Sequence, residues 1–178
     1  NAGGEVERRL QEEIKQNFSC ERICSLLIKT YKNLLPHGEA ALVAFADPGT
    51  IDISSGKTLQ AVNLPAWEKV NVKKLFRDNS ADHNPLCIPE TLAHTYAEYL
   101  HCAPDFPKSL FHARFSEGIG SGFINNGELL IGNRCASMEL GHLVLLPTGR
   151  RCRCGNRGCL EAMAGGAALK QMMQELVE

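Results

Sequence analysis

The pattern of apolar and polar positions predicts two helices in the first 35 residues. Val6, Leu10 and Ile14 recur every four residues, as they would on one face of a helix. Ser19 can cap a second helix by accepting a backbone hydrogen bond, and Glu21 suits the positive first turn of that helix. Its predicted buried stripe consists of Cys24, Leu27, Ile28, Tyr31 and Leu35, and Pro36-His37-Gly38 ends it.

An uninterrupted apolar run, Ala40 to Ala46, has the length of a strand. A strand without polar positions is expected to be buried on both faces of its sheet. It leads into a tight turn at Asp47-Pro48-Gly49. Beyond Trp67 the apolar positions return to helical spacing, with Val72, Leu75 and Phe76 on one side. Helix and strand patterns therefore alternate along the first half of the chain.

The second half of the chain continues this alternation. Leu110 to Phe115 predicts a strand, and Asn126-Gly127 is the signature of a type I′ hairpin turn. Gly118, Gly120 and Gly122 lie between these two signals. A glycine-rich turn can bind phosphate through its backbone N–H groups. The GxGxxG spacing is absent, however, and no helix begins there, so a conformational role is expected for these glycines.

Composition and charge exclude several classes of protein. The net charge is −1 over 178 residues, without the basic face that nucleic-acid binding requires. No apolar stretch is long enough to cross a membrane, and no signal peptide is present. Five cysteines outside the metal motif described next are dispersed and fit reduced thiols in a cytoplasmic protein. They are Cys20, Cys24, Cys87, Cys102 and Cys135.

The strongest chemical signal is a zinc loop at residues 141–161. His142, Cys152, Cys154 and Cys159 follow the spacing H-x9-C-x-C-x4-C. One imidazole and three thiolates suit tetrahedral Zn²⁺, and four protein ligands leave no open coordination position, so the expected role is structural. Glycines inside the loop allow the sharp bends that bring these ligands together. A disulfide between two of the cysteines, or free thiols, are the alternatives.

Acidic residues bracket the zinc loop. Glu139 and Glu161 stand on either side of it, and His142 belongs to both groups. Carboxylates accept hydrogen bonds from vicinal hydroxyls, and the free edge of a metal-bound imidazole can donate one. These three residues are therefore candidates for binding a sugar, with ordinary solvated carboxylates as the alternative.

The Gly-His pair followed by CxCGxxGCxE, after a glycine-rich hairpin, resembles the ROK family of sugar kinases and sugar-responsive transcriptional repressors. The resemblance covers about residues 38 to 170. It implies a ribonuclease-H-like α/β fold of the actin/hexokinase type, a structural zinc, and sugar contacts from Glu139, His142 and Glu161. FADPGTID and AVNLPAW resemble two further family segments that lie near the sugar, which makes Gly49 and Asn63 candidates.

The sequence departs from the kinase branch of the family at two positions. Kinases carry ENDAN, whose Asp acts as the general base, and alignment places Glu90 at that Asp and Pro89 at the preceding Asn. Kinases also carry TGIGGG, and Glu117 stands at its Thr. A longer carboxylate and a displaced reacting group would impair phosphoryl transfer, whereas a sugar could still bind beside Glu90.

The sequence also lacks the DxGGTK phosphate loop of the kinases and the helix-turn-helix of the repressors. We therefore expect one ROK-type sugar-binding domain over residues 1–178, truncated at both ends. The predicted function is the non-catalytic, sugar-sensing effector domain of a ROK transcriptional regulator. The expected partners are a sugar or sugar derivative, a second copy of the chain, and DNA only through a helix-turn-helix outside it.

Two other functions stay open. One is a fragment of an ATP-dependent ROK sugar kinase with Glu90 as general base. The other is a zinc-stabilised interaction domain that no longer binds sugar.

Overall fold

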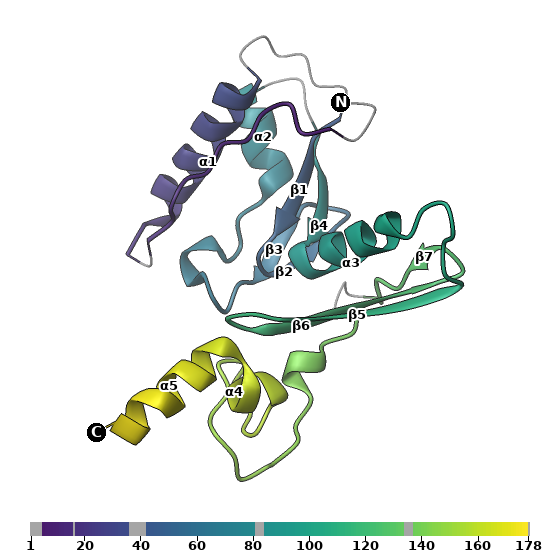
Figure 1. Cartoon of the computed structure of the whole chain (residues 1–178). Helices are drawn as coiled ribbons and strands as arrows, with labels where there is room; N and C mark the ends of the chain where they lie inside the picture. The colour runs from purple at the N-terminus through teal and green to yellow at the C-terminus, as the bar shows by residue number, and fades with distance from the viewer. Residues whose placement is uncertain (1–4, 16, 36–41, 81–83, 134–136, 178) are drawn as a thin grey trace. The chain divides into compact units, whose positions relative to one another are not determined.

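The computed structural model describes residues 5–15, 17–35, 42–80, 84–133 and 137–177 (Figure 1). The chain forms two compact units that meet in sequence between Ile88 and Pro89. Both units contain helices and strands, so the predicted α/β class is confirmed. The prediction of a single domain over residues 1–178 stays a prediction.

The described residues of the first unit form two helices, a short 3-10 helix and two small sheets. Its elements are α1 (Cys20–Leu34), β1 (Ala44–Asp47), β2 (Thr50–Asp52), β3 (Lys57–Gln60), η1 (Pro65–Trp67), α2 (Val72–Ser80) and β4 (Leu86–Pro89). One sheet pairs β1 with β4, and the other is the antiparallel hairpin β2–β3. Ser19 caps α1 as predicted, because its hydroxyl accepts the N–H of Arg22 at 3.3 Å.

The predicted helix around Val6, Leu10 and Ile14 is wrong. Residues 5–15 form no regular element, and all three apolar side chains are exposed, Val6 by 73%. A short helix is marginal in water unless its apolar face packs against other elements. The four-residue spacing alone therefore does not produce a helix here.

The expected strand before Asp47 is present as β1, but burial on both of its faces is wrong. Ala44 and Ala46 are exposed and Phe45 is half-buried. Within the described ranges β1 has one strand neighbour, β4, and a two-stranded sheet covers little of either face. The start of the predicted strand at residues 40–41, and the helix-ending segment 36–38, lie outside the described residues.

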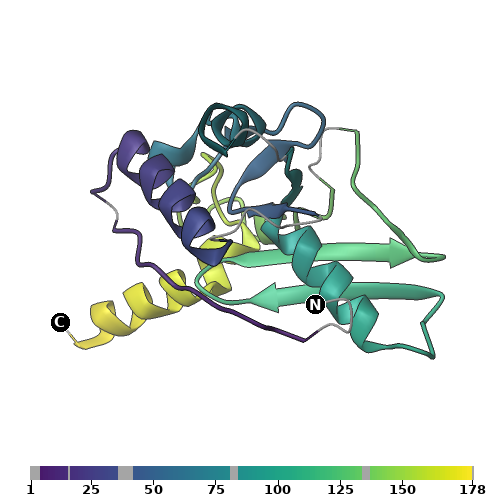
Figure 2. The ribbon, with the colours of Figure 1, turned by 90° about the horizontal axis from the view of Figure 1, so that it is seen from above.

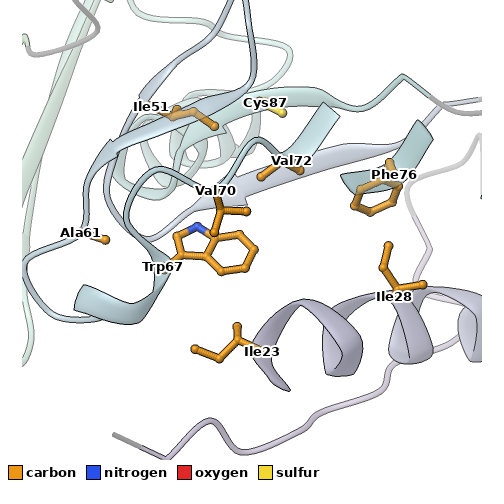
Figure 3. Close-up of a cluster of buried hydrophobic side chains, with 9 residues drawn as sticks. All are labelled: Ile23, Ile28, Ile51, Ala61, Trp67, Val70, Val72, Phe76 and Cys87. Atoms are coloured by element: carbon orange, nitrogen blue, oxygen red, sulfur yellow. The ribbon is translucent and has the colours of Figure 1, made fainter. Parts of the chain in front are cut away.

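The core of the first unit surrounds Trp67 (Figure 3). Helix α1 contributes Ile23 and Ile28, and α2 contributes Val72 and Phe76. The remaining buried members of this core are Ile51, Ala61, Val70 and Cys87. The ring of Tyr31 packs edge-on against Phe76 with centroids 4.9 Å apart. The predicted apolar faces of both helices therefore do meet in one core.

The second unit combines a three-stranded sheet with helices. Its elements are α3 (Glu90–His101), β5 (Ser109–Phe115), β6 (Ile119–Asn125), β7 (Glu128–Leu129), η2 (Leu140–His142), α4 (Leu160–Ala164) and α5 (Gly166–Val177). The strands pair antiparallel in the order β5-β6-β7, and Figure 2 shows β5 and β6 side by side in opposite directions. No helix in the described part of the chain has the length and apolar character needed to span a bilayer.

The predicted strand at residues 110–115 and the predicted hairpin turn are both confirmed. Asn126 and Gly127 join β6 to β7 with φ angles of 52° and 80°, as a type I′ turn requires. The hairpin therefore follows from its two turn residues.

The expected conformational role of Gly118, Gly120 and Gly122 does not come from a left-handed backbone. None of the three has a positive φ angle. Instead, a Cβ at Gly120 would lie 2.8 Å from the Thr91 hydroxyl, and one at Gly122 would overlap the Thr95 hydroxyl. Gly120 and Gly122 therefore let α3 approach β6 closely, and Figure 1 shows α3 lying over the sheet.

Candidate metal centre and ligand site

Four potential metal ligands converge in the 141–161 loop. One ligand atom each from His142, Cys152, Cys154 and Cys159 lies within 4.8 Å of the other three. His142 Nδ1 is 3.6 Å from Cys152 Sγ, and Cys154 Sγ is 3.7 Å from Cys159 Sγ. A disulfide bond is about 2.05 Å long, so the disulfide alternative is wrong: the three cysteines of the loop form no disulfide. We refer to these four residues as the four-ligand cluster.

The loop backbone bends around the cluster through its glycines and through short hydrogen bonds. Gly155 and Gly158 have φ angles of 100° and 68°, which side chains rarely permit. The N–H of Gly158 donates to the carbonyl of Arg150 at 2.8 Å, and that of Cys152 donates to Asn156 at 2.8 Å. The predicted reason for glycines in this loop is therefore confirmed at these two positions.

The environments of the three sulfurs differ. Burial raises the pKa of Cys159 to about 12 and also raises the pKa of Cys152. Burial acts in the same direction on Cys154, but hydrogen bonds, first from the backbone of Asn156, outweigh it and lower the pKa of that thiol. Buried thiolates need a compensating positive charge, which a bound metal ion supplies.

Two carboxylates stand beside the four-ligand cluster. Glu139 Oε2 lies 4.0 Å from His142 Nε2, on the side of the imidazole away from the sulfurs. Glu161 follows Cys159 by two residues, and its Oε2 accepts the N–H of Ile119 at 2.7 Å. A Cβ at Gly141 would be 3.4 Å from the Cβ of Glu161, so η2 and α4 are in contact there. Glu139 therefore lies near His142, and the helix that carries Glu161 contacts η2, which contains His142.

Glu90 begins α3 and is held in an ion pair. Its Oε1 accepts from Arg114 Nη1 at 2.9 Å and lies 3.3 Å from His94 Nε2. Burial raises the pKa of Glu90, but the hydrogen bonds and charges of Arg114 and His94 outweigh it and lower that pKa overall. Pro89 precedes it at the N-cap position without a side-chain hydrogen bond. Glu90 is therefore an ionised and engaged carboxylate.

Arg114 and His94 are absent from the predicted site residues. His94 could have been found from its i, i+4 spacing after Glu90 on a predicted helix. Arg114 reaches Glu90 from β5, 24 residues away in sequence, and only the packing of α3 on the sheet brings the two together.

Comparison with known proteins identifies the family. The family model described as "ROK family" matches residues 7–178. The chain belongs to the ROK family. The glucokinase of Thermotoga maritima is 28% identical over 97% of this chain and 54% of that protein. The DNA-binding transcriptional dual regulator NagC of Escherichia coli is 31% identical over 74% of this chain and 32% of that protein. This chain thus spans about half or less of the length of these ROK relatives.

The fold is also that of solved ROK structures. The crystal structure of a ROK glucokinase from Streptomyces griseus, in complex with glucose and AMPPNP, superposes with a TM-score of 0.78 at 22% identity. The superposition covers 91% of this chain and 51% of that one. The expected α/β fold with actin/hexokinase-like neighbours is confirmed. Because ROK relatives include both kinases and repressors, membership does not decide between catalysis and sensing.

The two sugar-binding candidates of the first unit have different surroundings. The N–H of Gly49 donates to Asp47 Oδ1 at 2.8 Å, and a Cβ at Gly49 would overlap the Gln60 carbonyl. Packing alone therefore requires glycine at that position. Asn63 is exposed in the segment between Ala61 and η1. In this ROK chain both remain predicted sugar contacts.

Proposed function

We propose that this chain is the sugar-sensing, non-catalytic effector region of a ROK transcriptional regulator, with a structural zinc beside its sugar site. The observation that carries the proposal is the position of the His142 ring. Its Nδ1 faces Cys152 Sγ at 3.6 Å and its Nε2 faces Glu139 Oε2 at 4.0 Å. One imidazole thus connects the four-ligand cluster to a carboxylate that can accept hydrogen bonds from hydroxyl groups.

Two separations within the four-ligand cluster support zinc. A tetrahedral site with usual Zn–S and Zn–N bond lengths has S···S edges of about 3.8 Å and N···S edges of about 3.6 Å. Cys154 Sγ and Cys159 Sγ are 3.7 Å apart, and His142 Nδ1 is 3.6 Å from Cys152 Sγ. Three thiolates and one imidazole complete the coordination shell, so the ion would stabilise the loop without activating water.

A bound zinc would also set the chemistry of the sugar site. With Nδ1 on the metal, the neutral ring of His142 carries its proton on Nε2 and becomes a hydrogen-bond donor. Glu161 uses Oε2 for the N–H of Ile119, which leaves Oε1 for a ligand hydroxyl. Glu139 supplies a second, exposed carboxylate. One donor and two acceptors on rigid elements suit a neutral sugar with adjacent hydroxyls.

The surroundings of Glu90 favour sensing over catalysis. A general base works best with a pKa near the working pH and a carboxylate within reach of the reacting hydroxyl. Arg114 and His94 lower the pKa of Glu90 and occupy one of its oxygens. Glu117 adds a negative charge next to Gly118, where a phosphate would be repelled. We therefore assign Glu90 at most a role in sugar binding.

In the regulator, a bound sugar must favour one conformation of the protein over another. DNA binding would belong to a helix-turn-helix outside this chain, and self-association to a second copy. Both partners, and a cytoplasmic location, are parts of the proposal that rest on ROK membership.

The alternative function is an ATP-dependent sugar kinase. The similarity to a glucokinase over 97% of this chain favours it. We would measure ATP-dependent phosphorylation of glucose, N-acetylglucosamine and N-acetylmannosamine by the intact gene product. We expect sugar binding without turnover. Turnover that Glu90→Gln abolishes would instead establish the kinase.

Sugar binding is tested by calorimetry with the same three sugars. We expect Glu139→Gln and Glu161→Gln to weaken binding by at least about tenfold, because each removes a charged acceptor. Glu98→Gln, at an exposed position on α3, is the matched control and should bind like the parent chain. Equal affinity in all variants would show that Glu139 and Glu161 do not bind the sugar.

A further inference from the structure

The least exposed carboxylate in the described part of the chain is that of Asp47, and the site above does not use it. Asp47 ends β1 and is 1% exposed. Its Oδ1 accepts the N–H of Gly49 at 2.8 Å. Its Oδ2 accepts the Thr58 hydroxyl at 2.6 Å and the indole N–H of Trp67 at 2.9 Å. Three donors satisfy the oxygens of a buried carboxyl group, which would be costly to leave without hydrogen bonds.

The three donors come from three separate segments. Gly49 belongs to the turn after β1, Thr58 to β3, and Trp67 to the end of η1. One side chain therefore fixes the turn at residues 48–49 and the segment 61–67 relative to each other. An asparagine amide could not replace it, because it offers one oxygen and would direct N–H groups toward donors.

Both sugar-binding candidates of the first unit lie in the segments that Asp47 connects. Gly49 is bonded to Asp47 directly. Asn63 lies in the short stretch before η1, where Leu64 N–H donates to Ala61 at 3.0 Å and Trp67 N–H donates to Leu64 at 2.8 Å. The relative positions of the Gly49 backbone and of the 61–67 segment, which carries Asn63, therefore depend on a carboxyl group that is 1% exposed.

We propose that Asp47 is a positioning residue for sugar binding: it sets Gly49 and Asn63 through its bonds to the turn and to Trp67. The proposal rests on the proposed function, since it requires that the chain binds a sugar. We further infer that the fluorescence of Trp67 reports sugar binding. Trp67 is the only tryptophan of the chain, and its indole N–H donates to the same carboxylate oxygen as Thr58. Ligand contact at the turn or at Asn63 should therefore change its fluorescence.

The test compares the parent chain with Asp47→Asn, using calorimetry and tryptophan emission with glucose, N-acetylglucosamine and N-acetylmannosamine. We expect a sugar-dependent emission change in the parent chain. In Asp47→Asn we expect at least tenfold weaker binding and loss of the emission change, with the metal content retained. Asp52→Asn is the matched control, because the Asp52 carboxylate accepts hydrogen bonds from Ser54 and Ser55 within its own turn.

A gentler pair of variants covers the case in which Asp47→Asn fails to fold. Thr58→Val removes one hydrogen-bond donor to Asp47 and should weaken sugar binding several-fold. Thr58→Ser keeps the hydroxyl and should bind sugar with nearly parental affinity. A folded Asp47→Asn or Thr58→Val chain that binds sugar with parental affinity would overturn the positioning role alone. If the parent chain binds none of the three sugars, the proposed function fails together with this inference.

Discussion

Glu161 accepts a hydrogen bond from the backbone N–H of Ile119 at 2.7 Å, across 42 residues of sequence. The hydrogen bond joins the end of the 141–161 loop to the start of β6. Gly118 makes it possible, because a Cβ there would overlap the Glu161 carboxylate. The position of Glu161, a proposed sugar-binding residue, therefore depends on Gly118, which is not itself proposed to contact the sugar.

Gly118→Ala should displace Glu161 and weaken sugar binding. We expect at least about a tenfold loss of affinity, since the added methyl group occupies the space of the carboxylate. The four-ligand cluster should still bind one metal ion per chain. Calorimetry and metal analysis of the same preparations check both expectations. Ser116→Ala, at an exposed neighbouring position, serves as the control. Undiminished affinity in Gly118→Ala would show that Glu161 does not contact the sugar.

Removal of the metal should destabilise the second unit. A structural zinc contributes several kcal/mol to folding in small domains, because its site does not exist in the unfolded chain. We expect a strong chelator, or Cys154→Ser, to lower the midpoint of thermal unfolding and to release close to one zinc per chain. Cys102→Ser changes a thiol outside the four-ligand cluster and should do neither. A purified chain without metal and with parental stability would contradict the structural role.

The ion pair of Glu90 should contribute little to stability, and only above acidic pH. Its pKa is lowered in the folded chain, so the pair stabilises the fold above the unfolded pKa of about 4.3 and the contribution is lost as pH falls through the folded pKa. The side chains of Glu90 and Arg114 are 44% and 42% exposed, so solvent screens the pair. We expect Glu90→Gln to cost about 0.5 kcal/mol at pH 7 and almost nothing near pH 3. Urea unfolding at both pH values measures the difference, and a larger loss at pH 3 would reverse the assigned sign.

The guanidinium of Arg150, in the 141–161 loop, is paired with the carboxylate of Glu175. Both of its terminal nitrogens donate to Glu175 on α5, one of them at 3.1 Å, and the pKa of Glu175 is lowered, chiefly by this hydrogen bonding. Glu175→Gln should therefore loosen the last turns of α5. Hydrogen exchange should show faster exchange of the amides at residues 172–177, with exchange in β6 unchanged. Identical protection of these amides in the variant would mean that the Arg150–Glu175 ion pair does not stabilise the end of α5.

Local patterns predicted those parts of the fold that local chemistry determines. Ser19 caps α1 and Asn126-Gly127 forms its turn because both depend on a few consecutive residues. The four-ligand cluster was predictable for a similar reason, since its three cysteines lie within eight residues. The residue types alone favoured a metal.

Features that depend on packing could not be predicted in this way. Val6 and Leu10 keep helical spacing but find no surface to cover, so no helix forms. Gly122 is one of three closely spaced glycines in the sequence, and only the fold shows that it makes room for Thr95. The bond between Glu90 and Arg114 requires α3 to lie on β5, and no spacing rule encodes that contact. Sequence patterns thus give elements and motifs, and packing decides what those elements bury.

The shared ring of His142 has a further consequence. If the chain binds zinc and a sugar as proposed, an imidazole with Nδ1 toward Cys152 and Nε2 toward Glu139 would make the two binding equilibria interdependent, because the ion would fix which nitrogen keeps the proton. Thermodynamic reciprocity would then require that a bound sugar raises the affinity for zinc by the same factor as bound zinc raises the affinity for the sugar. A cell starved of zinc would in that case also lose its response to the sugar.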